Sequence, residues 1–132
     1  MRAMVIAALL GAMALSTPGQ EQRSSQDKVY SRTQARDGAR LYREACGACH
    51  ARDEFVGPDY MDSWTGKSAA ELFVVIRDGM PEEAPGSLSR PETAALVAYF
   101  FQMNGMPAGD TALRSDAASL EEIRIEGPYR NE

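Results

Sequence analysis

The stretch Cys46-Gly47-Ala48-Cys49-His50 decides how the rest of this 132-residue chain is interpreted. It contains both cysteines and the one histidine of the sequence. C-x-x-C-H is the pattern of covalent haem attachment, in which the two thiols bind the haem and the following imidazole binds the iron. The pentapeptide therefore predicts one haem c, attached through Cys46 and Cys49, with His50 as an axial ligand of the iron.

Three other chemistries use closely spaced cysteines, and each lacks something that it needs here. A structural zinc ion takes four ligands, so Asp53 and Glu54 would have to replace the missing second Cys or His pair. A thioredoxin-like redox pair belongs to a βαβ unit, which the surrounding pattern does not indicate. A disulfide between the two cysteines would close a very small loop and constrain little. Haem attachment is the interpretation that the sequence favours.

The first twenty residues have the pattern of an export signal. Arg2 gives a basic start, residues 3–15 are almost wholly apolar, and residues 16–20 are polar with a proline and a glycine. This order is typical of a secretory signal peptide, and the apolar run is short for a membrane span, which needs about 20 residues. An uncleaved anchor is the alternative, and the cleavage site is open between residues 12–14 and a point nearer Gly19. We expect a periplasmic protein without a stable membrane span after cleavage.

Charge and compartment agree with this expectation. An exported protein meets an environment that oxidises thiols, and haem attachment would use both cysteines. The net charge of −5 argues against a nucleic-acid partner. It suits a carrier that meets redox partners through charge complementarity, although simple solubility would give the same balance.

Capping residues and apolar spacing predict three main helices joined by loops. The pattern Ser-x-x-Glu/Gln at residues 31–34, 68–71 and 89–92 is that of a capping box at the start of a helix. Apolar residues then recur at helical spacing after each box. Gly79 and the Asn104-Gly105 pair are placed to end the second and third helices. Long runs with period two are missing, so the predicted class is all-α with few or no strands.

A low-spin haem needs a ligand on the second face of the iron, and no second histidine exists to supply it. Besides water, the candidates are Met61, Met80, Met103, Met106, Lys28 and Lys67. Met80 directly follows the second helix and is fixed by Pro81, so it can reach the face opposite His50. We expect His50/Met80 ligation, which raises the reduction potential. If Met80 did not bind, the open iron would suit a gas sensor or a peroxidase-like enzyme.

The order of these features resembles that of class I (monohaem) cytochromes c over about residues 33–103. The resemblance implies an all-α cytochrome c fold, with three main helices plus loops around one covalently attached haem. It implies that Gly38 and Tyr99 meet where the first and last helices cross. It also implies that the Pro58 carbonyl accepts a hydrogen bond from His50, and that Trp64 packs near the haem. Many members have glycine after the histidine, where this chain has alanine.

A finer resemblance concerns residues 80–89, 104–109 and the tail after them. These segments look like those of cytochrome c subunits that serve quinoprotein (PQQ-dependent) alcohol or sugar dehydrogenases. The resemblance implies a one-electron carrier, not itself an enzyme, that passes electrons from such a dehydrogenase to a terminal oxidase or another cytochrome of the respiratory chain. The expected organisation is a signal peptide over 1–20, a flexible arm over 21–32, a cytochrome c domain over 33–107 and a C-terminal extension over 108–132.

Overall fold

The computed structural model describes residues 22–130, so the predicted signal peptide lies outside the described residues. The described chain is rich in helix. Its elements, in chain order, are β1 (Arg23–Ser24), α1 (Arg32–Ala45), the 3-10 helix η1 (Arg52–Phe55), α2 (Pro58–Met61), α3 (Ala69–Gly79), α4 (Arg90–Met103), α5 (Ala117–Glu121) and β2 (Ile123–Arg124). The helices α1, α3 and α4 cover the three predicted main helices, and the short helices α2 and α5 are additional to them.

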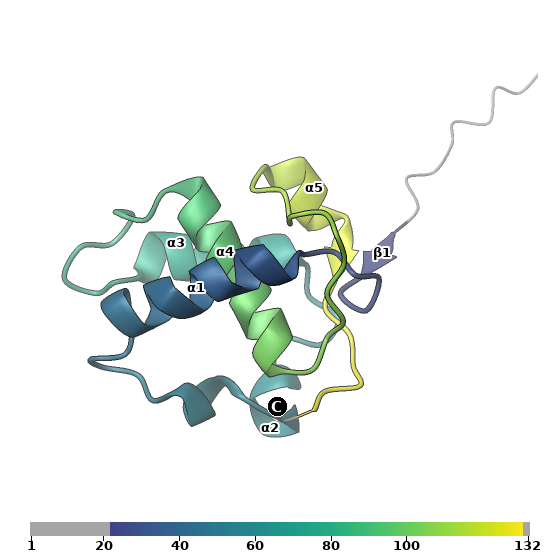
Figure 1. Ribbon diagram of the computed structural model, residues 1–132, viewed down its shortest axis with the longest axis horizontal. Helices are drawn as coiled ribbons and strands as arrows, with labels where there is room; N and C mark the ends of the chain where they lie inside the picture. Colours follow the sequence, from purple (N-terminus) through teal and green to yellow (C-terminus); the bar gives the residue numbers. More distant parts are fainter. Residues whose placement is uncertain (1–21, 131–132) are drawn as a thin grey trace, which may run out of the picture.

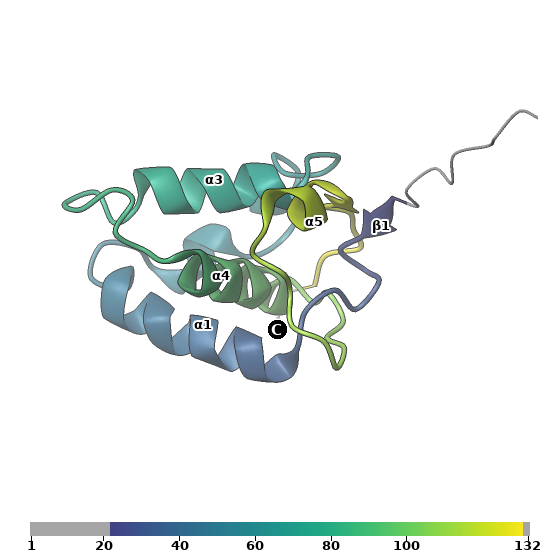
Figure 2. The same ribbon diagram turned by 90° about the horizontal axis from the view of Figure 1, so that it is seen from above.

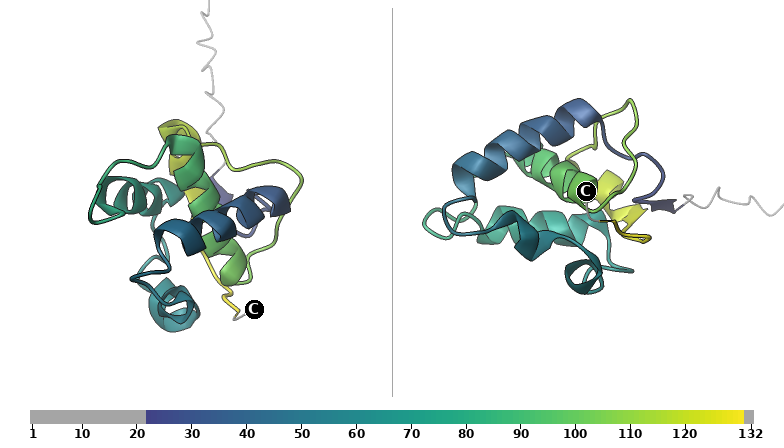
Figure 3. Two further views of the ribbon diagram at one scale, coloured as in Figure 1. Left: turned by 60° about the vertical axis from the view of Figure 1, so that its left-hand side comes forward. Right: turned by 60° about the horizontal axis from the view of Figure 1, so that its bottom comes forward.

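The helix α4 is the centre of the molecule. It lies between α1 on one side and α3 on the other, as Figures 1 and 2 show and Figure 3 confirms from two further directions. All residues from Thr93 to Ala98 are buried, whereas α1 buries one face through Ala35, Gly38 and Tyr42. A helix that is buried all round belongs inside a domain, and one with a single apolar face belongs at its surface.

Gly38 allows α1 and α4 to approach closely where they cross. A Cβ atom at this position would lie 2.5 Å from the carbonyl carbon of Ala95 and 2.9 Å from Cβ of Tyr99. Real carbon atoms prefer separations of about 3.5–4.0 Å. The expected meeting of Gly38 and Tyr99 at the crossing is confirmed, and only a residue without a side chain fits there.

The predicted capping boxes of α3 and α4 are confirmed. The hydroxyl groups of Ser68 and Ser89 accept the backbone N–H groups of Glu71 and Glu92, and both glutamate side chains accept the serine backbone N–H at 2.8 Å. Each box satisfies two N–H groups that would otherwise lack partners at the start of the helix.

The start of α1 is capped differently, because its glutamine is used elsewhere. Ser31 accepts the backbone N–H of Gln34 at 3.2 Å. The Gln34 side chain, however, donates to the carbonyl of Leu113 at 2.9 Å and accepts its N–H at 2.7 Å. The glutamine therefore ties α1 to the segment after α4 instead of completing a capping box.

That C-terminal segment packs on its own domain. Five of its apolar side chains are buried in the core, namely Met106, Leu113, Leu120, Ile123 and Ile125. The strand β2 pairs in parallel with β1, with Arg23 opposite Ile123. Residues after α4 therefore extend the core of the domain.

A flexible arm is expected over residues 21–32, and the described part of it, residues 22–32, is instead packed on the domain. Val29 and Tyr30 are 4% and 1% exposed, and the Tyr30 hydroxyl donates to the carbonyl of Met106 at 2.7 Å. The Ser25 hydroxyl donates to the carbonyl of Glu126 at 3.2 Å. Two apolar anchors and these hydrogen bonds fix a stretch whose composition is mostly polar.

None of the helices in residues 22–130 is long and apolar enough to cross a membrane.

Candidate haem-binding site

An apolar pocket with a volume of about 120 Å³ lies where α1, α3 and α4 come together with the loop after α1. Its lining consists of Tyr42, Cys46, His50, Phe55, Tyr60, Leu72, Val75, Ile76, Met80, Leu96 and Phe100. Three of the predicted site residues are among them. Cys46 caps the C-terminus of α1, His50 lies in the following loop, and Met80 caps the C-terminus of α3.

Met80 is the one methionine of residues 22–130 that lines this pocket. Met61, Met103 and Met106 are no more than 3% exposed and belong to the surrounding core. The alternative Lys67 places its ammonium group 4.8 Å from the centre of the Trp64 ring. These positions favour Met80 among the candidates for the second axial ligand.

The backbone and side chain of His50 are each held by a neighbour. The Tyr42 hydroxyl donates to the His50 carbonyl at 3.1 Å. Nδ1 of His50 lies 3.3 Å from Oε2 of Glu54, and the other carboxylate oxygen accepts the N–H of Ala51 at 2.8 Å. A metal-binding histidine commonly uses its second ring nitrogen in this way, which fixes the orientation of the ring. The arrangement leaves Nε2 of His50 for an iron ion.

Burial and charge shift the pKa values of three groups beside the pocket. Burial, with the neighbouring Cys46 and Glu54, raises the pKa of Tyr42 to about 12, so its phenol remains a hydrogen-bond donor over the whole physiological range. Burial raises the pKa of the Cys46 thiol. Hydrogen bonds from the Ala51 N–H and the His50 ring lower the pKa of Glu54, which keeps this carboxylate charged.

Phe55 completes the wall of the pocket beside the histidine. Its ring centre lies 5.2 Å from those of His50, Tyr60 and Phe100. The lining therefore combines aromatic and aliphatic surface with one thiol, one imidazole and one thioether. This set fits a haem, because the macrocycle is apolar and its iron takes nitrogen and sulfur ligands.

Pro58 and Trp64 do not line the pocket. The Pro58 carbonyl accepts the N–H of Asp62 at 2.7 Å at the end of α2, and the ring nitrogen Nδ1 of His50 lies within hydrogen-bond distance of Glu54 instead. Trp64 lies in a neighbouring surface groove, under Lys67. The structure thus does not bring these two residues together with His50, and their roles remain predictions.

Sequence reasoning missed the part played by Asn104, which it took only as the end of a helix. Its side chain is buried and bonded to three backbone groups, those of Phe55, Gly57 and Phe100. An asparagine before a glycine indicates the end of a helix, and nothing in the local sequence indicates which distant loop its side chain reaches.

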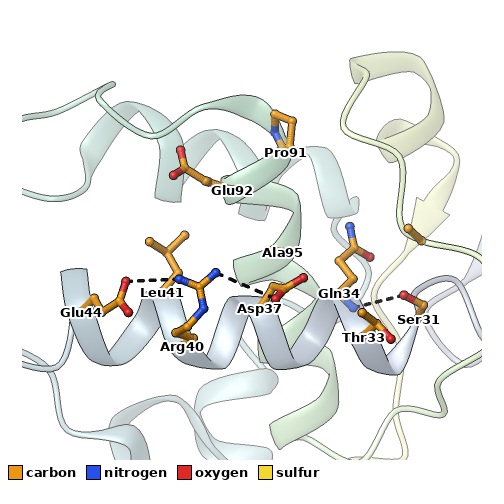
Figure 4. A pocket seen from close by; sticks show the side chains of 11 residues that line it. Ser31, Thr33, Gln34, Asp37, Arg40, Leu41, Glu44, Pro91, Glu92 and Ala95 are labelled. Atoms are coloured by element: carbon orange, nitrogen blue, oxygen red, sulfur yellow. Dashed lines mark hydrogen bonds and ion pairs between the residues drawn. The ribbon is translucent and has the colours of Figure 1, made fainter.

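A larger and more polar groove lies between α1 and the first half of α4 (Figure 4). Arg40 lies across it, 3.9 Å from Asp37 and 3.6 Å from Glu44, with all three side chains about 60% exposed. Exposed ion pairs of this kind contribute little to stability.

Among residues 22–130, no three His, Cys, Asp or Glu side chains are grouped so that they could hold a metal ion.

Cys46 and His50 of the C-x-x-C-H motif line this apolar pocket, whereas Cys49 is exposed beside it. A family model described as cytochrome c oxidase, cbb3-type, subunit III matches residues 33–100, and the chain belongs to this family. Membership implies haem c as the cofactor and electron carriage as the kind of function. Searches of curated proteins and of solved structures find no significant match.

Proposed function

We propose that this chain is a periplasmic one-electron carrier. Its haem c would be bound through Cys46 and Cys49, with Nε2 of His50 and the sulfur of Met80 as axial ligands. The observation that carries the proposal is the meeting of Cys46, His50 and Met80 at one apolar pocket, although η1, α2 and α3 separate the histidine from the methionine in the chain.

The haem supplies a one-electron couple when bound, and the residues of the chain determine its surroundings. Glu54 orients the imidazole, and Tyr42 holds the backbone of His50. The aromatic and aliphatic lining keeps water away, which together with a sulfur ligand raises the reduction potential. Because the Tyr42 hydroxyl holds the backbone of His50 and the Ile76 carbonyl holds that of Met80, the two ligands need to move little when the iron changes its oxidation state.

The partners follow from two resemblances that differ in detail. The matching family model is described by an oxidase subunit. The loops after α3 and α4 instead resemble subunits that serve quinoprotein dehydrogenases. Both resemblances are compatible with a carrier of a respiratory chain, so we propose that electrons come from a periplasmic dehydrogenase and leave toward a terminal oxidase or another cytochrome. The net charge of −5 supports a partner with a basic docking face.

The visible spectrum of the exported holoprotein tests the ligands directly. Met80→Leu removes the sulfur while keeping the volume, and Met61→Leu is the matched control because Met61 is buried outside the pocket. We expect a low-spin spectrum with a far-red sulfur-to-iron band in the wild type and in Met61→Leu, and its loss in Met80→Leu. A high-spin wild type that changes on adding carbon monoxide would contradict the proposal and indicate a sensor or a peroxidase-like enzyme.

A further inference from the structure

The side chain of Asn104 joins the central helix to the loop that follows the attachment motif. Asn104 directly follows α4 and is 0% exposed. Its Oδ1 accepts the N–H of Gly57 at 2.8 Å, and its Nδ2 donates to the carbonyls of Phe55 and Phe100 at 2.9 Å each. Both N–H donors of the amide and its oxygen acceptor are therefore hydrogen-bonded in the protein interior, so the orientation of the Asn104 side chain is fixed by its partners.

The two loop groups that Asn104 binds lie on either side of a single residue. Gly57 has a φ of 95°, a backbone conformation that favours glycine, and the loop needs a fixed partner for its N–H at this turn. Phe55 precedes it by two positions. By holding the carbonyl of one residue and the N–H of the other, Asn104 determines the path of the chain between η1 and α2.

This path determines what lies against the imidazole of His50. The Phe55 ring is 5.2 Å from the His50 ring, at an angle of 59° between their planes. Glu54, the residue before Phe55, places its carboxylate 3.3 Å from Nδ1 of the same histidine. Both groups that set the orientation of the imidazole therefore belong to the short segment whose end is fixed by Asn104.

We propose that Asn104 is a positioning residue for His50. Through its hydrogen bonds to Phe55 and Gly57, it holds Phe55 and Glu54 against the imidazole and thereby sets the orientation of this ligand and the reduction potential. The proposal rests on the proposed function, because it takes His50 as the iron ligand. A residue that only ends α4 would affect stability without affecting the imidazole, and this difference makes the proposal testable.

Three variants of the holoprotein separate the two roles. Asn104→Leu keeps the approximate volume and removes all three hydrogen bonds. Asn104→Asp keeps the acceptor for Gly57 and removes the donors to Phe55 and Phe100. Leu120→Ala is the control, because this buried leucine lies in α5, outside the pocket lining, and its truncation lowers stability through the core alone.

The measurements are amide hydrogen exchange at Gly57, the hyperfine-shifted proton resonances of the His50 ring in the ferric protein, and the reduction potential. In Asn104→Leu we expect Gly57 to exchange at least about tenfold faster relative to the slowest core amides, with displaced His50 resonances and a changed potential. In Asn104→Asp we expect Gly57 to stay protected while the His50 resonances move. Leu120→Ala should lower the unfolding temperature and leave the other readouts at their wild-type values.

Wild-type Gly57 exchange, His50 resonances and potential in Asn104→Leu would overturn the proposal, as would an equal response in Leu120→Ala. If Asn104→Leu does not accumulate with haem, Asn104→Asp provides the test: displaced His50 resonances would support the proposal, and wild-type resonances would overturn it. The test is separate from that of the proposed function, since absence of the far-red band in the wild type would refute Met80 ligation and leave the Gly57 and His50 comparison intact.

Discussion

Replacing Gly38 with alanine should destabilise the domain by forcing α1 and α4 apart. The added Cβ would lie 2.5 Å from the carbonyl carbon of Ala95 and closer still to its oxygen, so the helices must separate by more than about 1 Å to restore ordinary contact. Overpacking of this kind costs about 1–3 kcal/mol, and the upper end applies because the obstructing atoms belong to the backbone of Ala95 and cannot change rotamer. Alanine recovers about 1 kcal/mol of helix propensity. The expected net loss is about 2 kcal/mol.

The assay is thermal unfolding of the holoprotein followed by far-UV circular dichroism. For a domain of this size, about 2 kcal/mol lowers the unfolding temperature by about 8 °C. Gly79→Ala is the matched control, because Gly79 also lies in a helix and no atom lies within 4 Å of a Cβ placed there. We expect the control to be as stable as the wild type or up to about 1 kcal/mol more stable, because alanine has the higher helix propensity. A Gly38→Ala protein as stable as the control would refute the close crossing of α1 and α4.

Two further predictions concern a helix cap and the C-terminal segment. Hydrogen bonds from the Ser89 hydroxyl and backbone N–H lower the pKa of Glu92 below its ordinary 4.5, so its stabilisation of α4 is present above pH 4.5 and is lost as the pH falls through the lower folded value. Urea unfolding at several pH values should therefore show wild type more stable than Glu92→Gln near neutrality, with the difference vanishing in acid; a difference that grows in acid would contradict this. Leu120→Ala should lower the free energy of unfolding by about 2–5 kcal/mol, because the side chain is completely buried. Val74→Ala, at a residue 51% exposed, is its control, and equal stability of the two variants would mean that the tail is not docked as described.

The features that could be predicted from the sequence are those with a local signature. A serine followed by a glutamate three residues later predicts the starts of α3 and α4, and both capping boxes are present in the structure. Gly38 could be singled out because glycine is unfavourable inside a helix unless another element packs closely against it. The crossing with α4 is that element. The position of Met80 at the end of α3 also followed from the sequence, since a glycine and a proline flank it.

The features that could not be predicted depend on contacts between distant parts of the chain. Gln34 has the spacing of a capping residue, and only the folded chain shows that Leu113 takes its amide. Val29 and Tyr30 are two apolar residues in a polar stretch, too few to show a periodic pattern, yet both are buried. The partner of Nδ1 of His50 is a similar case. The family resemblance implies Pro58, whose role stays a prediction, and the structure has Glu54 beside this nitrogen, four residues after the histidine.

The same contrast applies to the site as a whole. The attachment motif is a contiguous pentapeptide, so the sequence alone indicates the cofactor. The pocket is assembled from α1, α3 and α4 together with residues of η1 and α2, and the position of its aromatic wall at Phe55 depends on the buried amide of Asn104. Sequence reasoning therefore indicates what is bound, and the fold indicates which residues hold the ligand in its orientation.

The most direct test of the central claim is an equilibrium redox titration of the exported holoprotein, followed through its visible spectrum. We predict a single reversible one-electron transition, a low-spin spectrum in both oxidation states and no response of the ferrous protein to carbon monoxide, because His50 and Met80 would stay bound throughout. A high-spin state at either end of the titration, or a ferrous protein that binds carbon monoxide, would contradict the assignment of this pocket to an electron carrier.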